Sequence, residues 1–156
     1  MSMIKRFITG VFFLGLFLGS VIASAAQSNI MVTEPRVRAM PPGTSNTAAY
    51  MNIKNTGKTN ISLQKVTSSI SNNIQLHDTI KKDGKMSMVE QESIIIPAGK
   101  RVKLQPRSLH VMIMKVSKTL VTGEKVSLDL HFSNGEVITV KAPVKKQVLE
   151  KGNLSG

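Results

Sequence analysis

The sequence predicts an all-β domain, either a β-sandwich or a Greek-key barrel. Apolar and polar residues alternate in short runs of about five to nine residues, which is the pattern of half-buried strands. Turn-forming residues separate these runs every 10 to 15 residues or so, as in sandwiches and barrels. No segment after the N-terminal apolar run requires the 3.6-residue period of a helix.

Each expected strand is bounded by residues that favour turns. The expected strands are Ala48 to Lys54, Ile61 to Thr67, Ile74 to Asp78, Lys85 to Gln91, Arg101 to Gln105, Leu109 to Val116, Lys125 to Phe132 and Glu136 to Lys141. The turns between them include Asn55-Thr56-Gly57, Lys82-Asp83-Gly84, Pro97-Ala98-Gly99, Thr122-Gly123 and Ser133-Asn134-Gly135. The last of these is a good hairpin signal, because Asn-Gly lies between two alternating apolar runs.

The N-terminus has the form of an export signal. Lys5 and Arg6 precede an apolar run from Phe7 to Ile22, and Ala23-Ser24-Ala25 resembles a cleavage site. We therefore expect a signal peptide over residues 1–25, one folded domain over 26–144 and a polar, flexible tail over 145–156. An uncleaved membrane helix is the alternative, but about 16 apolar residues fall short of the roughly 20 that span a bilayer. No cysteine follows the run, so we expect a soluble exported protein without a lipid anchor.

Composition excludes a broad class of metal and redox chemistry. The 156 residues contain no cysteine, nine methionines and three histidines. Disulfides, thiolate nucleophiles, iron–sulfur clusters, thiolate zinc sites and blue-copper centres all need a cysteine sulfur. Thioether is therefore the only soft sulfur that this chain offers to a metal.

The positive charge is spread along the chain. The formal charge of +12 falls to +10 without Lys5 and Arg6, and the remaining basic residues form no basic arm. Tyr50 and Phe132 are the aromatic residues that follow the signal, too few for stacking on single-stranded nucleic acid. We therefore expect no nucleic-acid partner. Between His77 and Lys118 there are nine Lys or Arg against four Asp or Glu, which suits docking on an acidic protein.

Two histidines and several methionines recur at strand spacing. His77 is followed by ten residues and Met88, then by 21 residues and His110, then by one residue and Met112. Residues i and i+2 of a strand share a face, so His110 and Met112 should project together, with Met114 on the same side. Thioether and imidazole without carboxylate or thiolate suit Cu(I).

Structural roles for the same residues remain open at this point. Methionine is a common core residue, and Met86 or Met114 alone is more often packing than ligand. A single histidine on an alternating strand is more often hydrogen-bonded than metal-bound. The joint pattern is stronger than any of its members.

The string His77-x10-Met88-x21-His110-x-Met112 resembles the signature of the periplasmic copper chaperone family PCu(A)C, which supplies the CuA centre of cytochrome c oxidase. The resemblance runs from about Ile30 to Lys141 and includes Arg38 to Gly43, Thr47 to Met51, Asp83 to Met88 and Ile96 to Gly99. It implies a cupredoxin-like β-sandwich in the periplasm that binds one Cu(I) through His77, Met88, His110 and Met112.

Two departures from the family pattern stand out. The family usually has Pro-Gly-Gly before the second histidine, whereas this chain has Pro106-Arg107-Ser108-Leu109-His110. Some relatives carry a tail rich in His and Met that is thought to hold a second copper. Residues 145–156 contain neither residue type, so we expect one ion only.

We expect a carrier rather than an enzyme, because no nucleophile elbow, general base or oxyanion device is evident. Neutral thioether ligands suit transfer by ligand exchange to an acceptor protein, such as the CuA subunit or another copper chaperone. We expect the carrier to be a monomer. The alternatives are a copper scavenger with the same site, a structural envelope domain without metal, and a copper electron carrier or oxidase.

Overall fold

The protein is described by a computed structural model that covers residues 27–146. The expected signal peptide and residues 147–156 of the expected tail lie outside this range, so those two predictions stay predictions. Within it the chain is all-β, as predicted. The strands are β1 (Ile30–Arg38), β2 (Thr47–Asn55), β3 (Ile61–Thr67), β4 (Asn73–Lys82), β5 (Lys85–Gln91), β6 (Ile94–Ile96), β7 (Arg101–Leu104), β8 (His110–Met114), β9 (Lys125–Phe132) and β10 (Val137–Lys145). Over the same range, no helix is long and apolar enough to cross a membrane.

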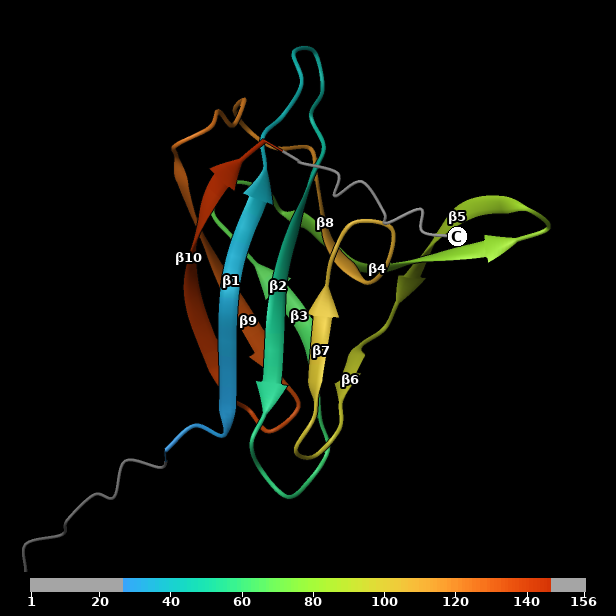
Figure 1. Cartoon of the computed structure of the whole chain (residues 1–156). Helices are drawn as coiled ribbons and strands as arrows, with labels where there is room; N and C mark the ends of the chain where they lie inside the picture. Colours follow the sequence, from blue (N-terminus) through green and yellow to red (C-terminus); the bar gives the residue numbers. More distant parts are fainter. Residues whose placement is uncertain (1–26, 147–156) are drawn as a thin grey trace, which may run out of the picture.

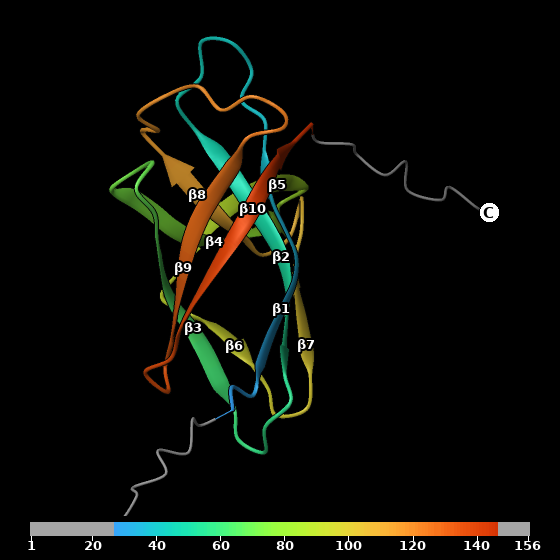
Figure 2. The same ribbon diagram turned by 90° about the vertical axis from the view of Figure 1, so that its left-hand side faces the viewer.

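The strands form two layers that are joined at one side. Their order is β5-β4-β8-β2-β1-β10-β9-β3-β6, and β7 pairs with β2. β1 and β10 are parallel, with Val37 opposite Val144, while the other neighbours are antiparallel. At this junction the sheet folds over, so that β10, β9, β3 and β6 cover the layer that contains β2 (Figures 1 and 2).

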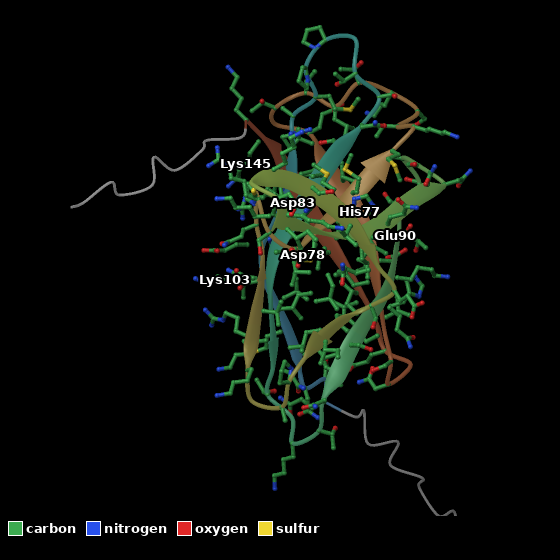
Figure 3. All side chains as sticks on the ribbon, turned by 90° about the vertical axis from the view of Figure 1, so that its right-hand side faces the viewer. His77, Asp78, Asp83, Glu90, Lys103 and Lys145 are labelled. Atoms are coloured by element: carbon green, nitrogen blue, oxygen red, sulfur yellow. The ribbon has the colours of Figure 1, made fainter. Side chains whose placement is uncertain are left out.

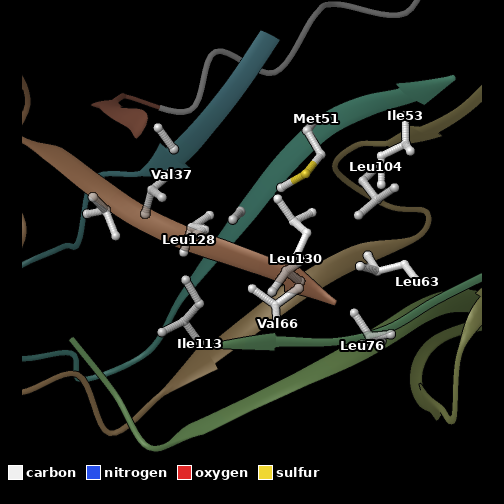
Figure 4. Packing of buried hydrophobic residues seen from close by; sticks show 14 of the residues in the cluster. Val37, Met51, Ile53, Leu63, Val66, Leu76, Leu104, Ile113, Leu128 and Leu130 are labelled. Atoms are coloured by element: carbon white, nitrogen blue, oxygen red, sulfur yellow. The ribbon is translucent and has the colours of Figure 1, made fainter. Parts of the chain in front are cut away.

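The core lies between the two layers. Figure 4 shows β9 crossing β2 with apolar side chains between the two strands. Met51 of β2, Leu128 and Leu130 of β9 and Ile113 of β8 are fully buried there. Burial of such side chains is the main favourable contribution to stability, at roughly 1.5–3 kcal/mol for each. The inner face of β8 is therefore occupied by the core, and its outer face is left for other roles.

Two strands were not among the predicted ones, and each breaks the period-two pattern. β1 contains Pro35, and its ladder with β2 shifts between Thr33 and Arg36, where Glu34 adopts a φ of 54°. A proline and a bulge hide the alternation of such a strand. β6 is a run of three isoleucines, of which only the middle one is exposed. A short uniform run carries no readable alternation.

The β4–β5 hairpin projects from the sandwich as an arm (Figure 1). β4 extends to Lys82, beyond the predicted end at Asp78, and Lys82 pairs with Lys85 across a two-residue turn. Asp83 and Gly84 have φ angles of 50° and 76°, the positive values that a type I′ hairpin turn needs. This turn confirms the prediction for Lys82-Asp83-Gly84, and it sets which residues of β4 and β5 lie opposite one another.

Candidate metal centre

His77 and His110 are direct neighbours across the sheet. The two residues are opposite one another in the β4–β8 ladder, and their rings meet edge to face with centroids 5.7 Å apart. The chain neighbours of the two histidines, Leu76 before His77 and Val111 after His110, are buried in the core. Alternation therefore places both imidazoles on the outer face of this layer.

The register brings Met88 and Met112 to the same face. Met112 is opposite Gln75 on β4, and Met88 is opposite Thr79 on the same strand. Each methionine is thus a diagonal neighbour of His77, within reach of a long side chain. Figure 3 views the molecule from the side of the arm, with His77 labelled on β4. All four residues of the predicted ligand set lie on one face of β8, β4 and β5.

The ring of His110 is held in one tautomer by a hydrogen bond to the backbone. The side chain is only 4% exposed, and its Nδ1 lies 2.8 Å from the carbonyl oxygen of Ser108. A carbonyl oxygen can only accept, so Nδ1 carries the proton and Nε2 keeps its lone pair. Such a hydrogen bond to the second nitrogen orients a metal-binding imidazole.

His77 offers a lone pair of its own. Its Nε2 donates to Oε1 of Gln75 at 2.9 Å, while Nδ1 is buried and has no hydrogen-bond partner among residues 27–146. Burial lowers the pKa of His77, the neighbouring His110 lowers it further, and Glu90 across the hairpin acts in the opposite direction. The ring is therefore held neutral, as a metal ligand must be.

Exposure separates methionines that fill the core from methionines that do not. Met40 and Met51 are buried in the core, so packing explains them. Met88 and Met86 are 60% and 56% exposed on the arm, where packing cannot account for them. Met112 is half-buried, and it lies on the face opposite the core-facing Val111. Met86 and Met114 share the face of the four predicted ligands.

Three residues that shape the site were not predicted from the sequence. Gln75 and Ser108 hold the two imidazoles through their hydrogen bonds. Tyr50 of β2 lies beside His110, with ring centroids 6.5 Å apart. Each of these three roles depends on side-chain or backbone geometry that alternation alone does not specify.

Imidazole and thioether groups outnumber carboxylates around His77 and His110. No group of three or more His, Cys, Asp or Glu side chains comes together within the described residues. The two imidazoles and the neighbouring thioethers are donors that suit Cu(I), and the carboxylate of Glu90 lies opposite His77 on the same face.

Comparison with known proteins places the chain in a family. The family described as "Putative lipoprotein LpqE-like" matches residues 30–144. The chain belongs to this LpqE-like family. A relative from Leifsonia xyli subsp. xyli (strain CTCB07), described as a "Putative lipoprotein", is 38% identical over 117 residues, which are 74% of this chain and 69% of the relative.

Solved structures confirm the predicted cupredoxin-like fold. The LpqE-like chain matches the copper-bound PCuAC domain from PmoF2 with a TM-score of 0.67 at 23% identity, over 77% of this chain and 95% of that domain. It matches the Cu(I) form of DR1885 from Deinococcus radiodurans with a TM-score of 0.61 at 31% identity, over 81% and 85% of the two chains. These matches support the resemblance to the PCu(A)C copper chaperones.

Proposed function

We propose that this protein is a periplasmic carrier of one Cu(I) ion, which it binds through His77, Met88, His110 and Met112. The observation that carries the proposal is the pairing of His77 with His110 across β4 and β8, with a diagonal methionine on either side. The Cu(I) form of DR1885, which is 31% identical to this chain, supports the choice of metal.

The site suits transfer better than catalysis. Four neutral ligands leave the charge of Cu(I) uncompensated, and thioethers bind it without an anion that an acceptor must displace. A thiolate-bearing acceptor can therefore take the ion by stepwise exchange of ligands. The lipoprotein descriptions of the family and of the Leifsonia relative support an exported location.

The test of the site is an anaerobic Cu(I) titration in competition with a chromophoric chelator. We expect the wild-type protein to bind one equivalent and a His110→Ala variant to lose it. His131→Ala is the matched control, because His131 lies on β9 and contacts Thr67 rather than the site. Equal binding by all three proteins would return His110 to a structural role, whereas absence of binding by all three would leave a metal-free envelope domain as the function.

The recipient is a separate step of the proposal. We infer that the ion passes to the CuA centre of cytochrome c oxidase or to another copper chaperone, because the sequence resembles the chaperones that serve this centre. Mixing the Cu(I)-loaded protein with a reduced, metal-free CuA domain and then separating the two proteins measures the transfer. Copper found on the CuA domain supports delivery. Copper retained by the carrier would favour a scavenger that uses the same site.

A further inference from the structure

A basic groove lies beside the candidate copper site. It has a volume of about 750 Å³ and is formed by β1, β2, β7, the loop after β7 and the end of β10. Six cationic residues line it: Arg36, Arg38, Lys103, Arg107, Lys145 and Lys146. The one carboxylate in its lining is Glu34, whose Oε2 accepts a hydrogen bond of 2.7 Å from Asn52. The groove therefore carries a strong excess of positive charge.

The ring of Tyr50 separates the groove from His110, one of the predicted copper ligands. Tyr50 lies on β2, which has β1 and β8 as its neighbours. The guanidinium of Arg36 on β1 sits 5.3 Å from the centroid of the Tyr50 ring, and the centroid of the His110 ring on β8 lies 6.5 Å from it. The loop after β7 makes a second connection. Arg107 lines the groove, and the next residue, Ser108, accepts the hydrogen bond that orients His110. A ligand in the groove would therefore lie close to the candidate copper site.

We propose that the groove binds an acidic, extended segment of the protein that receives the copper. This inference rests on the proposed function, and it adds the place and the chemistry of docking. The six cations come from segments far apart in the sequence, and Arg36, Arg38, Lys145 and Lys146 lie outside the basic stretch between His77 and Lys118. The fold gathers them on one side of the molecule, where Figure 3 shows Lys103 and Lys145.

The shape of the surface favours a peptide over a membrane. A groove of this volume matches the size of pockets that enclose a ligand, and carboxylates entering it would meet the six cations that line it. Binding to an anionic bilayer instead uses basic clusters on flat or helical surfaces with apolar residues that insert between lipids. The apolar lining residues Pro35, Val37, Leu104 and Pro106 lie within the groove wall and form no such projecting cluster.

The experiment uses a fluorescein-labelled peptide of ten glutamates and measures its binding to the purified protein by fluorescence anisotropy. We expect binding at about 20 mM salt that weakens at least tenfold at about 300 mM, because salt screens exposed charges. The double variant Lys103→Glu/Lys145→Glu should bind the peptide at least about tenfold more weakly than wild type. Lys58→Glu/Lys65→Glu is the matched control, because it changes the net charge equally at exposed residues outside the groove, and it should bind within about twofold of wild type.

An equal loss of peptide affinity in the two double variants would overturn the proposal that the groove is the binding site, since net charge alone would then explain binding. Absence of peptide binding, with groove-dependent binding to phosphatidylglycerol vesicles, would overturn it in favour of a membrane. A Cu(I) titration of the same proteins keeps the two proposals distinguishable. Lys103 and Lys145 are not among the predicted ligands, so all three proteins should bind one equivalent. If none binds copper, the proposed function fails, whatever the peptide result.

Discussion

His110 and Met88 lie at opposite ends of the candidate site. His110 is in the middle of the sheet, is 4% exposed and has its ring oriented by the Ser108 carbonyl. Met88 is on an edge strand of the projecting arm and is 60% exposed. The imidazole end is thus organised before metal arrives, while the thioether end is open to solvent. Under the proposed function, we therefore expect copper to enter and leave at the arm, where an acceptor can replace Met88 first.

The largest expected effect on Cu(I) affinity comes from replacing the thioether side chains. Replacing Met88 or Met112 with Leu keeps an apolar side chain of similar volume, so the free energy of unfolding should change by less than about 1.5 kcal/mol. Each variant removes a soft sulfur, so we expect Cu(I) affinity to fall by about tenfold to a hundredfold. Chelator competition measures the affinity, and chemical denaturation measures the stability.

Met31→Leu is the control for Met88, because Met31 is also an exposed methionine, at 52%, but lies on β1. Its affinity should equal that of wild type. If Met88→Leu retained full affinity while Met112→Leu lost it, the arm would take no part in binding, and the contrast between the two ends would fail.

Protonation acts on the imidazole end. Cu(I) and a proton compete for the ring nitrogen that carries the lone pair, so Cu(I) affinity falls as the pH is lowered. The lowered pKa of His77 means that this ring takes up its proton at a lower pH than an ordinary histidine. We expect constant affinity from pH 7.5 to about 6 and a fall of about tenfold or more by pH 5. Flat affinity over the whole range, measured by chelator competition at each pH, would argue against two imidazole ligands.

The arm depends on its turn, which gives a smaller effect. Gly84 has a φ of 76°, and a Cβ added there would meet no atom within 4 Å, so Gly84→Ala introduces only backbone strain, of about 1–2 kcal/mol. We expect faster hydrogen exchange of the β5 amides and a loss of Cu(I) affinity of up to about tenfold. Gly135→Ala introduces the same strain at a φ of 84° in the β9–β10 hairpin. An equal loss of affinity in both variants would mean that the arm has no special role.

Local features could be predicted from the sequence, whereas the long-range register of the strands could not. Alternation in β8 correctly placed His110 and Met112 on one face, and Asp83-Gly84 correctly predicted the turn of the arm. The pairing of His77 with His110 depends on how β4 aligns with a strand that follows it by some 30 residues, which no local pattern specifies. The groove could not be predicted for the same reason, since parallel pairing of β1 with β10 brings Arg38 opposite Lys145.

The smallest effect concerns the loop that holds His110. Arg107 occupies this tight turn with a φ of 64°, and the turn is closed by a hydrogen bond of 2.8 Å from the Gln105 amide to the Leu109 carbonyl. An L-residue in this region costs about 1–2 kcal/mol, whereas glycine adopts it freely but loses about 0.5–1 kcal/mol of chain entropy on folding. Arg107→Gly should therefore stabilise the protein by up to about 1 kcal/mol and change Cu(I) affinity less than twofold, because the Ser108 carbonyl stays in place.

Arg101→Gly is the matched control, since Arg101 is an exposed residue of β7 with extended backbone. It should destabilise the protein by about 0.5–1 kcal/mol, so denaturation should show opposite signs for the two arginines. Destabilisation by both would mean that the side chain of Arg107 contributes contacts that outweigh its backbone strain. A loss of copper affinity in Arg107→Gly would mean that the orientation of His110 depends on this residue, and not only on the hydrogen bonds that close the loop.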